Sequence, residues 1–212
     1  MKALPDTLVA LAAIATCFAA PVAAASRSAD EIAVTVGQNG DVITINARLC
    51  VAVSVEEAWE VLTDFEHMTQ IVSNLESSQV LSRSGNKVVV SQRGRATRGP
   101  LSFAFDTVRE VDLQPYSLIR AHLLSGSLKR LEGATRLSSQ DAQTRIVNHG
   151  EFVADVWVPP VLGIHFIEAE TRKQYQEMRD EMLRRHRLHA TSGVSDAALD
   201  PISKRACDAD SD

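Results

Sequence analysis

Four side chains in the second half of the chain have the types that acid–base catalysis uses: His122, Asn148, His149 and Glu151. A histidine beside a carboxylate can take a proton from a reacting group and later return it. In the strand pattern QTRIVNHGEFVADVWV, however, His149 and Glu151 share a face with several other charged side chains. A mostly charged face is expected to lie in solvent. We therefore interpret these residues as surface groups of a strand.

The sequence carries no other recognisable catalytic or metal-binding pattern. It has no Ser-His-Asp order with a nucleophile elbow, no glycine loop for phosphate, no distinctive pair of carboxylates and no Cys/His metal spacing. Beyond the predicted signal peptide, Cys50 lies in an apolar strand pattern and Cys207 lies in a polar tail. Two cysteines are too few for a disulfide scaffold. We expect no cofactor and no metal, and nothing in the sequence favours an enzyme.

Two hydroxyl groups interrupt the apolar stripe of the last predicted helix. Ile167, Thr171, Tyr175 and Met178 are spaced by three and four residues and therefore share one helical face. A stripe that only filled a core would not need the hydroxyls of Thr171 and Tyr175. These groups could bind the polar end of a buried ligand, or they could bond to a sheet residue that faces the helix.

Apolar side chains of the predicted strands would face this stripe. In the pattern GPLSFAFDTVREV, Phe103 and Phe105 alternate with small or polar residues, and we place both toward the helix. With two residues from later strands, the candidate ligand-binding residues are Phe103, Phe105, Leu124, Phe152, Ile167, Thr171, Tyr175 and Met178. The alternative is that these side chains simply fill a core. A one-residue slip of strand register would exchange the two faces.

The elements that must position these residues are a sheet, a short helix pair and a long helix. In SVEEAWEVLTDFEHM, Ser54 and Glu57 have the spacing of a capping box, which predicts a helix start. Period-two patterns precede this segment and fill the region from about 75 to 158, with turns too short for helical crossovers. One helical stripe then runs to about Leu188. The order predicts an α+β fold: an antiparallel sheet of about seven strands packed on the final helix.

The two ends of the chain differ from this body. Residues 1–25 have one Lys near the start, an apolar run and a small-residue end, which is typical of a cleaved signal peptide. We expect a domain over 26–188 and a disordered polar tail over 189–212. The net charge of −5 gives no basic surface of the kind that nucleic acid requires. The prediction is an exported protein, most simply a periplasmic one, with no nucleic-acid partner.

Three segments together resemble the START-like superfamily of polyketide cyclases and coenzyme Q-binding proteins, also called SRPBCC or helix-grip proteins. They are SVEEAWEVLTDFEHMTQIVSNLESSQVL, the strand pair SLIRAHLLSGSLKRLEG, and the WVPP segment before the last helix. The resemblance covers roughly residues 32 to 186, and its specific part is the order of elements. It implies a curved sheet that grips the C-terminal helix around a largely apolar cavity. Members of the superfamily bind lipids, quinones, sterols or polyketide-like molecules, and a minority act on them chemically.

Three hypotheses follow for the function. The first is a non-enzymatic binding module for a lipid or isoprenoid quinone, with the ligand entering near the 64–74 turn. The second is a cyclase or aromatase that uses a cavity group such as Tyr175, which a polar pair within hydrogen-bonding reach would favour. The third is a protein-interaction module whose cavity has filled in. Arginine clusters at 93–98 and 184–187 could also contact anionic membrane lipids.

Overall fold

The computed structural model describes residues 32–99, 101–140, 142–156, 158–159 and 161–199. The predicted signal peptide over 1–25, Cys207 and the end of the predicted polar tail lie outside the described residues. Cys50 lies half-buried in a strand as a free thiol. No helix in the described part of the chain is both long and apolar enough to cross a membrane.

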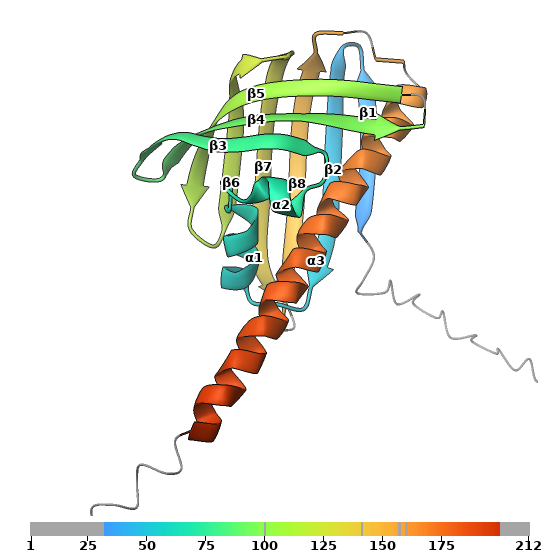
Figure 1. The fold of residues 1–212 in the computed structure, drawn as a ribbon. Coiled ribbons are helices and arrows are strands. Elements are labelled where there is room, and N and C mark those ends of the chain that lie inside the picture. The colour runs from blue at the N-terminus through green and yellow to red at the C-terminus, as the bar shows by residue number, and fades with distance from the viewer. Residues whose placement is uncertain (1–31, 100, 141, 157, 160, 200–212) are drawn as a thin grey trace, which may run out of the picture.

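Eight strands form one sheet in which each neighbouring pair is antiparallel. The strands are β1 (Ala33–Asn39), β2 (Val42–Val51), β3 (Leu75–Ser84), β4 (Lys87–Arg98), β5 (Leu101–Gln114), β6 (Leu118–Gly126), β7 (Leu128–Gln140) and β8 (Gln143–Ala154). Their order is β1-β2-β8-β7-β6-β5-β4-β3, so the first hairpin joins the last strand of the meander. The sheet is strongly curved, and β3, β4 and β5 bend across the face that the helices cover (Figure 1).

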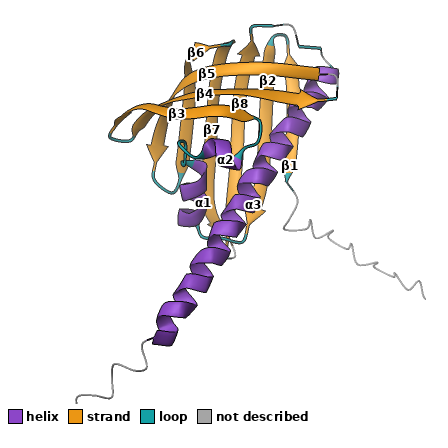
Figure 2. Ribbon diagram, in the orientation of Figure 1, coloured by secondary structure: helices purple, strands orange, loops and turns teal. Residues whose placement is uncertain are grey.

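Three helices lie on this concave side: α1 (Val55–Leu62), α2 (Met68–Ile71) and α3 (Leu162–Leu199). The predicted capping box is confirmed, because Ser54 Oγ accepts from the Glu57 amide at 3.2 Å and the Glu57 carboxylate accepts from the Ser54 amide at 2.9 Å. α3 crosses the sheet obliquely and projects past its edge (Figure 2). The architecture confirms the predicted α+β, helix-grip class.

The predicted end of the last helix near Leu188 is wrong, since α3 continues to Leu199. Loss of apolar periodicity ends the face that packs on the sheet, but a helix does not need a buried face to continue for a few turns. The first proline after Leu188 is Pro201, so no residue with a missing amide interrupts the hydrogen-bond ladder before that point. Residues 189–199 are therefore helical and lie beyond the sheet.

Two hydrophobic clusters hold the helices against the sheet. The larger joins β1, β2, β7, β8 and α1 to Met182 of α3, which is 1% exposed. The smaller packs Phe65, from the turn after α1, against valines of β4 and β5. Trp59 and Ile119 contact both clusters. Tyr175 and Met178 pack against the larger cluster, whereas the part of α3 before Tyr175 belongs to neither cluster and can face an open space.

Candidate functional site

A cavity of about 520 Å³ separates the first half of α3 from the curved sheet. Its wall is mostly apolar and is built from α3, strands β4 to β8, and the segment around α2. The alternation of β5 sends every second side chain inward, and the three-and-four spacing of α3 does the same from the opposite side. Such a space can hold a small hydrophobic molecule.

Seven of the eight predicted ligand-binding residues lie on the wall of this cavity: Phe103, Phe105, Phe152, Ile167, Thr171, Tyr175 and Met178. They come from three elements: β5, and the consecutive β8 and α3. Phe103 also packs edge-to-face on Phe166 of α3, with ring centroids 5.1 Å apart. That these residues bind a ligand stays a prediction, but the structure brings them together.

Leu124 is the exception, because it does not line the cavity and is 51% exposed. In the β5–β6 pair, Val108 is opposite Ser125 and Arg109 is opposite Leu123, so Leu124 is left without a partner in a β-bulge. Ile119 and Ala121 of the same strand line the cavity, so the alternation of side chains along β6 turns position 124 outward. The placement of Leu124 at the site is therefore corrected.

Tyr175 belongs to a polar group on the cavity wall. Its hydroxyl is hydrogen-bonded to Thr135 of β7, whose Oγ1 in turn accepts from Asn148 Nδ2 at 2.8 Å. Burial raises the pKa of Tyr175 well above its usual range, and the Thr135 hydrogen bond only partly opposes this effect. Tyr175 is thus a neutral phenol held in place by the sheet, which is the second of the two roles left open for its hydroxyl.

Arg109 of β5 is the most unusual side chain of the wall. One guanidinium nitrogen donates to Gln92 Oε1, and Gln92 Nε2 donates to Ser78 Oγ at 2.9 Å. Burial lowers the pKa of Arg109, and no carboxylate within the described residues forms an ion pair with it. Its Nε is buried without a hydrogen-bond partner. Since arginine remains charged in proteins, the cavity contains a cation with unused donor capacity.

A family model described as polyketide cyclase / dehydrase and lipid transport matches residues 51–179. This segment runs from the end of β2 through the cavity-lining half of α3. The chain belongs to this family. The START-like resemblance inferred from the sequence is thereby confirmed.

Solved structures with the fold of this polyketide cyclase / dehydrase and lipid transport domain include both enzymes and carriers. The Zhui aromatase/cyclase from Streptomyces sp. R1128 is 19% identical over 68% of this chain and 95% of its own, with a TM-score of 0.57. A STAR-related lipid transfer protein from Xanthomonas axonopodis is 10% identical over 72% and 99%, with a TM-score of 0.55. A START superfamily protein from Mycobacterium smegmatis is 14% identical over 66% and 97%, with a TM-score of 0.54. At these identities the likeness shows the fold alone. No match was found among curated proteins.

Three polar residues of the cavity wall, Gln92, Arg109 and Glu170, were not predicted as site residues from the sequence. Gln92 interrupts an otherwise apolar inward face of β4, with Val88 and Val90 before it and Ala96 after it. Arg109 follows Phe103, Phe105 and Thr107 on one face of β5, and Glu170 lies on the inward stripe of α3. A polar residue that breaks an apolar periodicity was the available signal. The Thr171 and Tyr175 hydroxyls were recognised by that same signal.

The histidines singled out for catalysis lie elsewhere, on the outer surface. His149 is exposed and its Nδ1 lies 2.8 Å from Asn46 Oδ1, while Glu151 accepts from Arg130 at 2.9 Å. His122 is also partly exposed and approaches Glu110 at 4.0 Å. The interpretation of this strand face as solvated agrees with these positions. Two members of the set border the cavity: Asn148, on the opposite face of β8 from His149, and Glu151, whose carboxylate is paired with Arg130.

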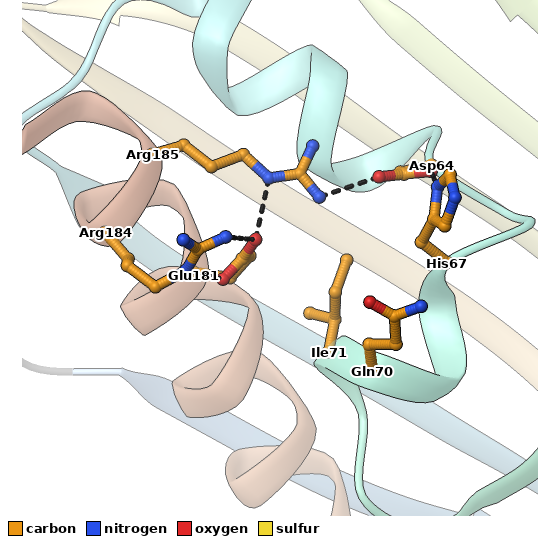
Figure 3. Close-up of a pocket in the computed structure, with 7 residues that line it drawn as sticks. All are labelled: Asp64, His67, Gln70, Ile71, Glu181, Arg184 and Arg185. Atoms are coloured by element: carbon orange, nitrogen blue, oxygen red, sulfur yellow. Dashed lines mark hydrogen bonds and ion pairs between the residues drawn. The ribbon is translucent and has the colours of Figure 1, made fainter. Parts of the chain in front are cut away.

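A second, polar pocket of about 400 Å³ lies between the turn after α1 and the middle of α3 (Figure 3). Arg185 bridges Asp64 Oδ2 and Glu181 Oε1, each at 2.7 Å, and Arg184 also pairs with Glu181. Hydrogen bonds from Arg184, and then from Arg185, lower the pKa of Glu181 to about 2. Burial raises the pKa of Asp64, but Arg185 and His67 outweigh it and hold that pKa below its usual range. These charges satisfy one another, so the pocket acts as a clamp between the two segments.

Proposed function

We propose that this protein is an exported, non-enzymatic binding or carrier protein for a hydrophobic small molecule, such as a lipid or an isoprenoid quinone. The observation that carries the proposal is the mostly apolar cavity of about 520 Å³ between sheet and α3, with Arg109 on its wall. The family description includes lipid transport, and a lipid transfer protein shares the fold. The periplasm is the compartment that the predicted signal peptide favours.

Burial of the apolar body would supply most of the affinity. Each Å² of apolar surface removed from water contributes about 25 cal/mol, less the free energy needed to immobilise the ligand. Phe103, Phe105 and Phe152 offer broad apolar surface from the sheet, and Met178 offers a flexible side chain from the helix. A wall of this kind selects for hydrophobic bulk and tolerates variation in shape.

Arg109 would orient the ligand within this cavity. A guanidinium donates to carbonyl, carboxylate or phenolate oxygens, and it does so most strongly where water is excluded. A quinone carbonyl or a lipid carboxylate could therefore complete its unused donor capacity. The buried cation thus supports an oxygen-bearing ligand over a pure hydrocarbon.

The exposure of the lining residues indicates that the cavity opens at the β8–α3 connection and not near the 64–74 turn. Val156 lines the cavity and is 63% exposed, so the wall there borders solvent. By contrast, Met68, Val72 and Asn74 are all buried. We therefore place ligand entry at the β8–α3 connection.

Peripheral membrane contact stays a proposal, and the two arginine clusters support it only weakly because most of their arginines have acidic partners. Arg93 and Arg95 lie 3.7 and 3.6 Å from the Glu76 carboxylate, and Arg184 and Arg185 are paired within the clamp. Arginines that already have acidic partners contribute less to attraction by anionic lipids. Any such contact would have to use other surfaces as well.

The second candidate is a cyclase or aromatase that acts on the bound molecule. The cavity wall carries two polar pairs within hydrogen-bonding reach, Tyr175 with Thr135 and Arg109 with Gln92. A polar pair of this kind is the feature expected of an enzyme. A structure with this fold is an aromatase/cyclase. The raised pKa of Tyr175, however, makes it a weak acid at neutral pH, where an efficient general acid needs a matched pKa. The third hypothesis, a filled cavity, does not agree with the open volume.

The decisive experiment is native mass spectrometry of the mature protein purified from its own periplasm, followed by organic extraction of what co-purifies. A lipid or quinone bound to the wild type and absent from the cavity-filling variant Thr171→Trp would support the binding function. The matched control is Asp180→Trp, on the exposed side of the same helix. An empty protein that also takes up no hydrophobic fluorescent probe would overturn the proposal. Recovery of the ligand with a changed mass, only when Arg109 is present, would favour the enzyme.

A further inference from the structure

We infer that Glu170 and Asn74 form a second polar subsite in the cavity, which binds a hydroxyl group at the far end of a ligand held by Arg109. The inference rests on the proposed function and narrows it. The ligand would be a hydrophobic molecule with an acceptor oxygen at one end and a hydrogen-bond donor at the other, as in a long-chain hydroxy acid.

Glu170 is a carboxyl group that the protein leaves nearly without partners. It is 8% exposed, lies on the inward stripe of α3 one turn after Phe166, and lines the cavity. Its one hydrogen bond comes from Asn74 Nδ2 at 3.4 Å, near the limit for such a bond. Within the described residues it forms no ion pair, whereas Glu168 and Glu177 on the same helix pair with Arg172 and Lys173.

Asn74 is held rigidly beside Glu170 by the sheet. Its backbone oxygen accepts from the Arg95 amide at 2.8 Å. Gly94 makes this approach possible, because a Cβ there would lie 2.3 Å from the Asn74 oxygen and 2.6 Å from Phe105 Cζ. The Asn74 side chain is turned into the protein, where the residue is 7% exposed and Oδ1 has no hydrogen-bond partner.

The unused capacity of this subsite is for accepting hydrogen bonds. Asn74 gives its amide donor to Glu170, which leaves Asn74 Oδ1 buried without a partner and the Glu170 carboxyl with one long hydrogen bond among the described residues. Buried acceptors of this kind are normally satisfied, so the missing partner is a donor brought in from outside. A ligand hydroxyl fits, because it can donate to one of these oxygens.

The spacing of the two subsites sets the separation of the ligand's polar groups. Gly94, against which Asn74 packs, is paired with Phe105, and Arg109 lies four residues farther along the same face of β5. At about 3.3 Å per residue, the backbone positions of Phe105 and Arg109 are roughly 13 Å apart along the strand, which sets the order of the distance between the two subsites. The wall between them carries Phe105 and Thr107, so an apolar chain would span that distance.

The test compares lauric acid with ω-hydroxylauric acid, which differ only by the terminal hydroxyl. Both are titrated by calorimetry into protein freed of bound lipid. We expect the hydroxy acid to bind about tenfold more tightly to the wild type, which corresponds to about 1.4 kcal/mol. In Glu170→Leu the two acids should bind equally. In Glu170→Gln, which keeps an acceptor oxygen and the side-chain shape, most of the preference should return.

The results of this titration distinguish a failure of the proposed subsite from a failure of the proposed binding function. If lauric acid binds but the wild type shows no preference for the hydroxy acid, the subsite is overturned and the binding function stands. A preference that persists in Glu170→Leu also overturns it. If neither acid nor a hydrophobic fluorescent probe binds, the proposed function fails, and the subsite with it. The control Glu168→Leu, an acid on the same helix away from the cavity, should bind both acids as the wild type does.

Discussion

The two halves of α3 use charged and polar side chains in opposite ways. In the first half, Glu170 faces the cavity with one long hydrogen bond, and on the strand side of the same cavity Arg109 has a buried nitrogen without a hydrogen-bond partner. In the second half, Glu181, Arg184 and Arg185 are partly exposed, yet each has an ionic partner (Figure 3). The protein thus completes its polar contacts where the helix is anchored and leaves them incomplete where it faces the cavity. Incomplete pairing at buried positions distinguishes the binding half from the structural half.

The largest effect is expected from removing the core contact of the anchored half. Met182→Ala should lower the free energy of unfolding by about 3 kcal/mol, because it opens a void in a packed cluster. Met178→Ala, one turn earlier, should cost less, about 2 kcal/mol, since its side chain packs on the same cluster on one side and borders the cavity on the other. Urea denaturation measures both. Equal losses for the two variants would contradict the distinction between the halves.

Arg109→Met is expected to stabilise the protein by about 1 to 2 kcal/mol while it weakens ligand binding. A buried cation without a carboxylate partner costs free energy that an apolar side chain of similar length does not. Lauric acid should bind about tenfold more weakly, because one charge-assisted hydrogen bond to the ligand is lost. The control is the exposed Arg120→Met, which should change both quantities little. A destabilised Arg109→Met with unchanged affinity would assign Arg109 a structural role.

Strong acid should weaken the clamp. The folded-state pKa of Glu181 is about 2 and its ordinary value is 4.5. A lowered pKa gives stability that is fully present above about pH 4.5 and is lost as the pH falls toward 2. We expect a loss of about 1 kcal/mol from this group after solvent screening. Between pH 5 and pH 2.5, the wild type should therefore lose roughly 1 kcal/mol more free energy of unfolding than Glu181→Gln does. Thermal unfolding over this pH range measures the difference. Identical profiles would show that the clamp does not hold the helix.

The smallest effect is expected from His67, on the rim of the clamp. Its side chain is 61% exposed and lies 2.6 Å from Asp64, which Arg185 already neutralises. His67→Ala should change the free energy of unfolding by no more than about 0.5 kcal/mol at neutral pH. A larger loss in the same denaturation assay would mean that His67, and not Arg185, positions Asp64.

Local patterns were sufficient to predict the order of elements. The Ser54–Glu57 capping box, the change to a two-residue period after α2 and the stripe of α3 each depend on neighbours within a few residues. Seven of the cavity residues followed from the same periodicities. Local patterns did not place Leu124, because both faces of β6 carry apolar residues and only the packing of the sheet shows that Ile119 and Ala121 are on the inward face. They also did not mark where α3 ends, since residues past Leu188 need no packing partner.

The polar groups of the cavity could not be predicted in the same way, because they are recognised as binding groups by the hydrogen-bond partners that they lack. Arg109 in the sequence is one arginine among many, and only its surroundings in three dimensions show that it lacks a carboxylate. Asn74 and Glu170 are 96 residues apart, and no spacing rule connects them. An unsatisfied group is a property of the assembled fold.

The pairing of β2 with β8 has a consequence for how the molecule folds. Strands β3 to β8 are joined by short turns and can form early, whereas Asn46 and His149 meet across 103 residues of chain. Contacts between such distant residues require a large loop to close and therefore form slowly. The docking of α3 on β1 closes a still longer loop, since Arg172 reaches the Ile32 carbonyl across 140 residues. We therefore expect the cavity to be completed late in folding, so that a bound ligand slows unfolding without speeding folding.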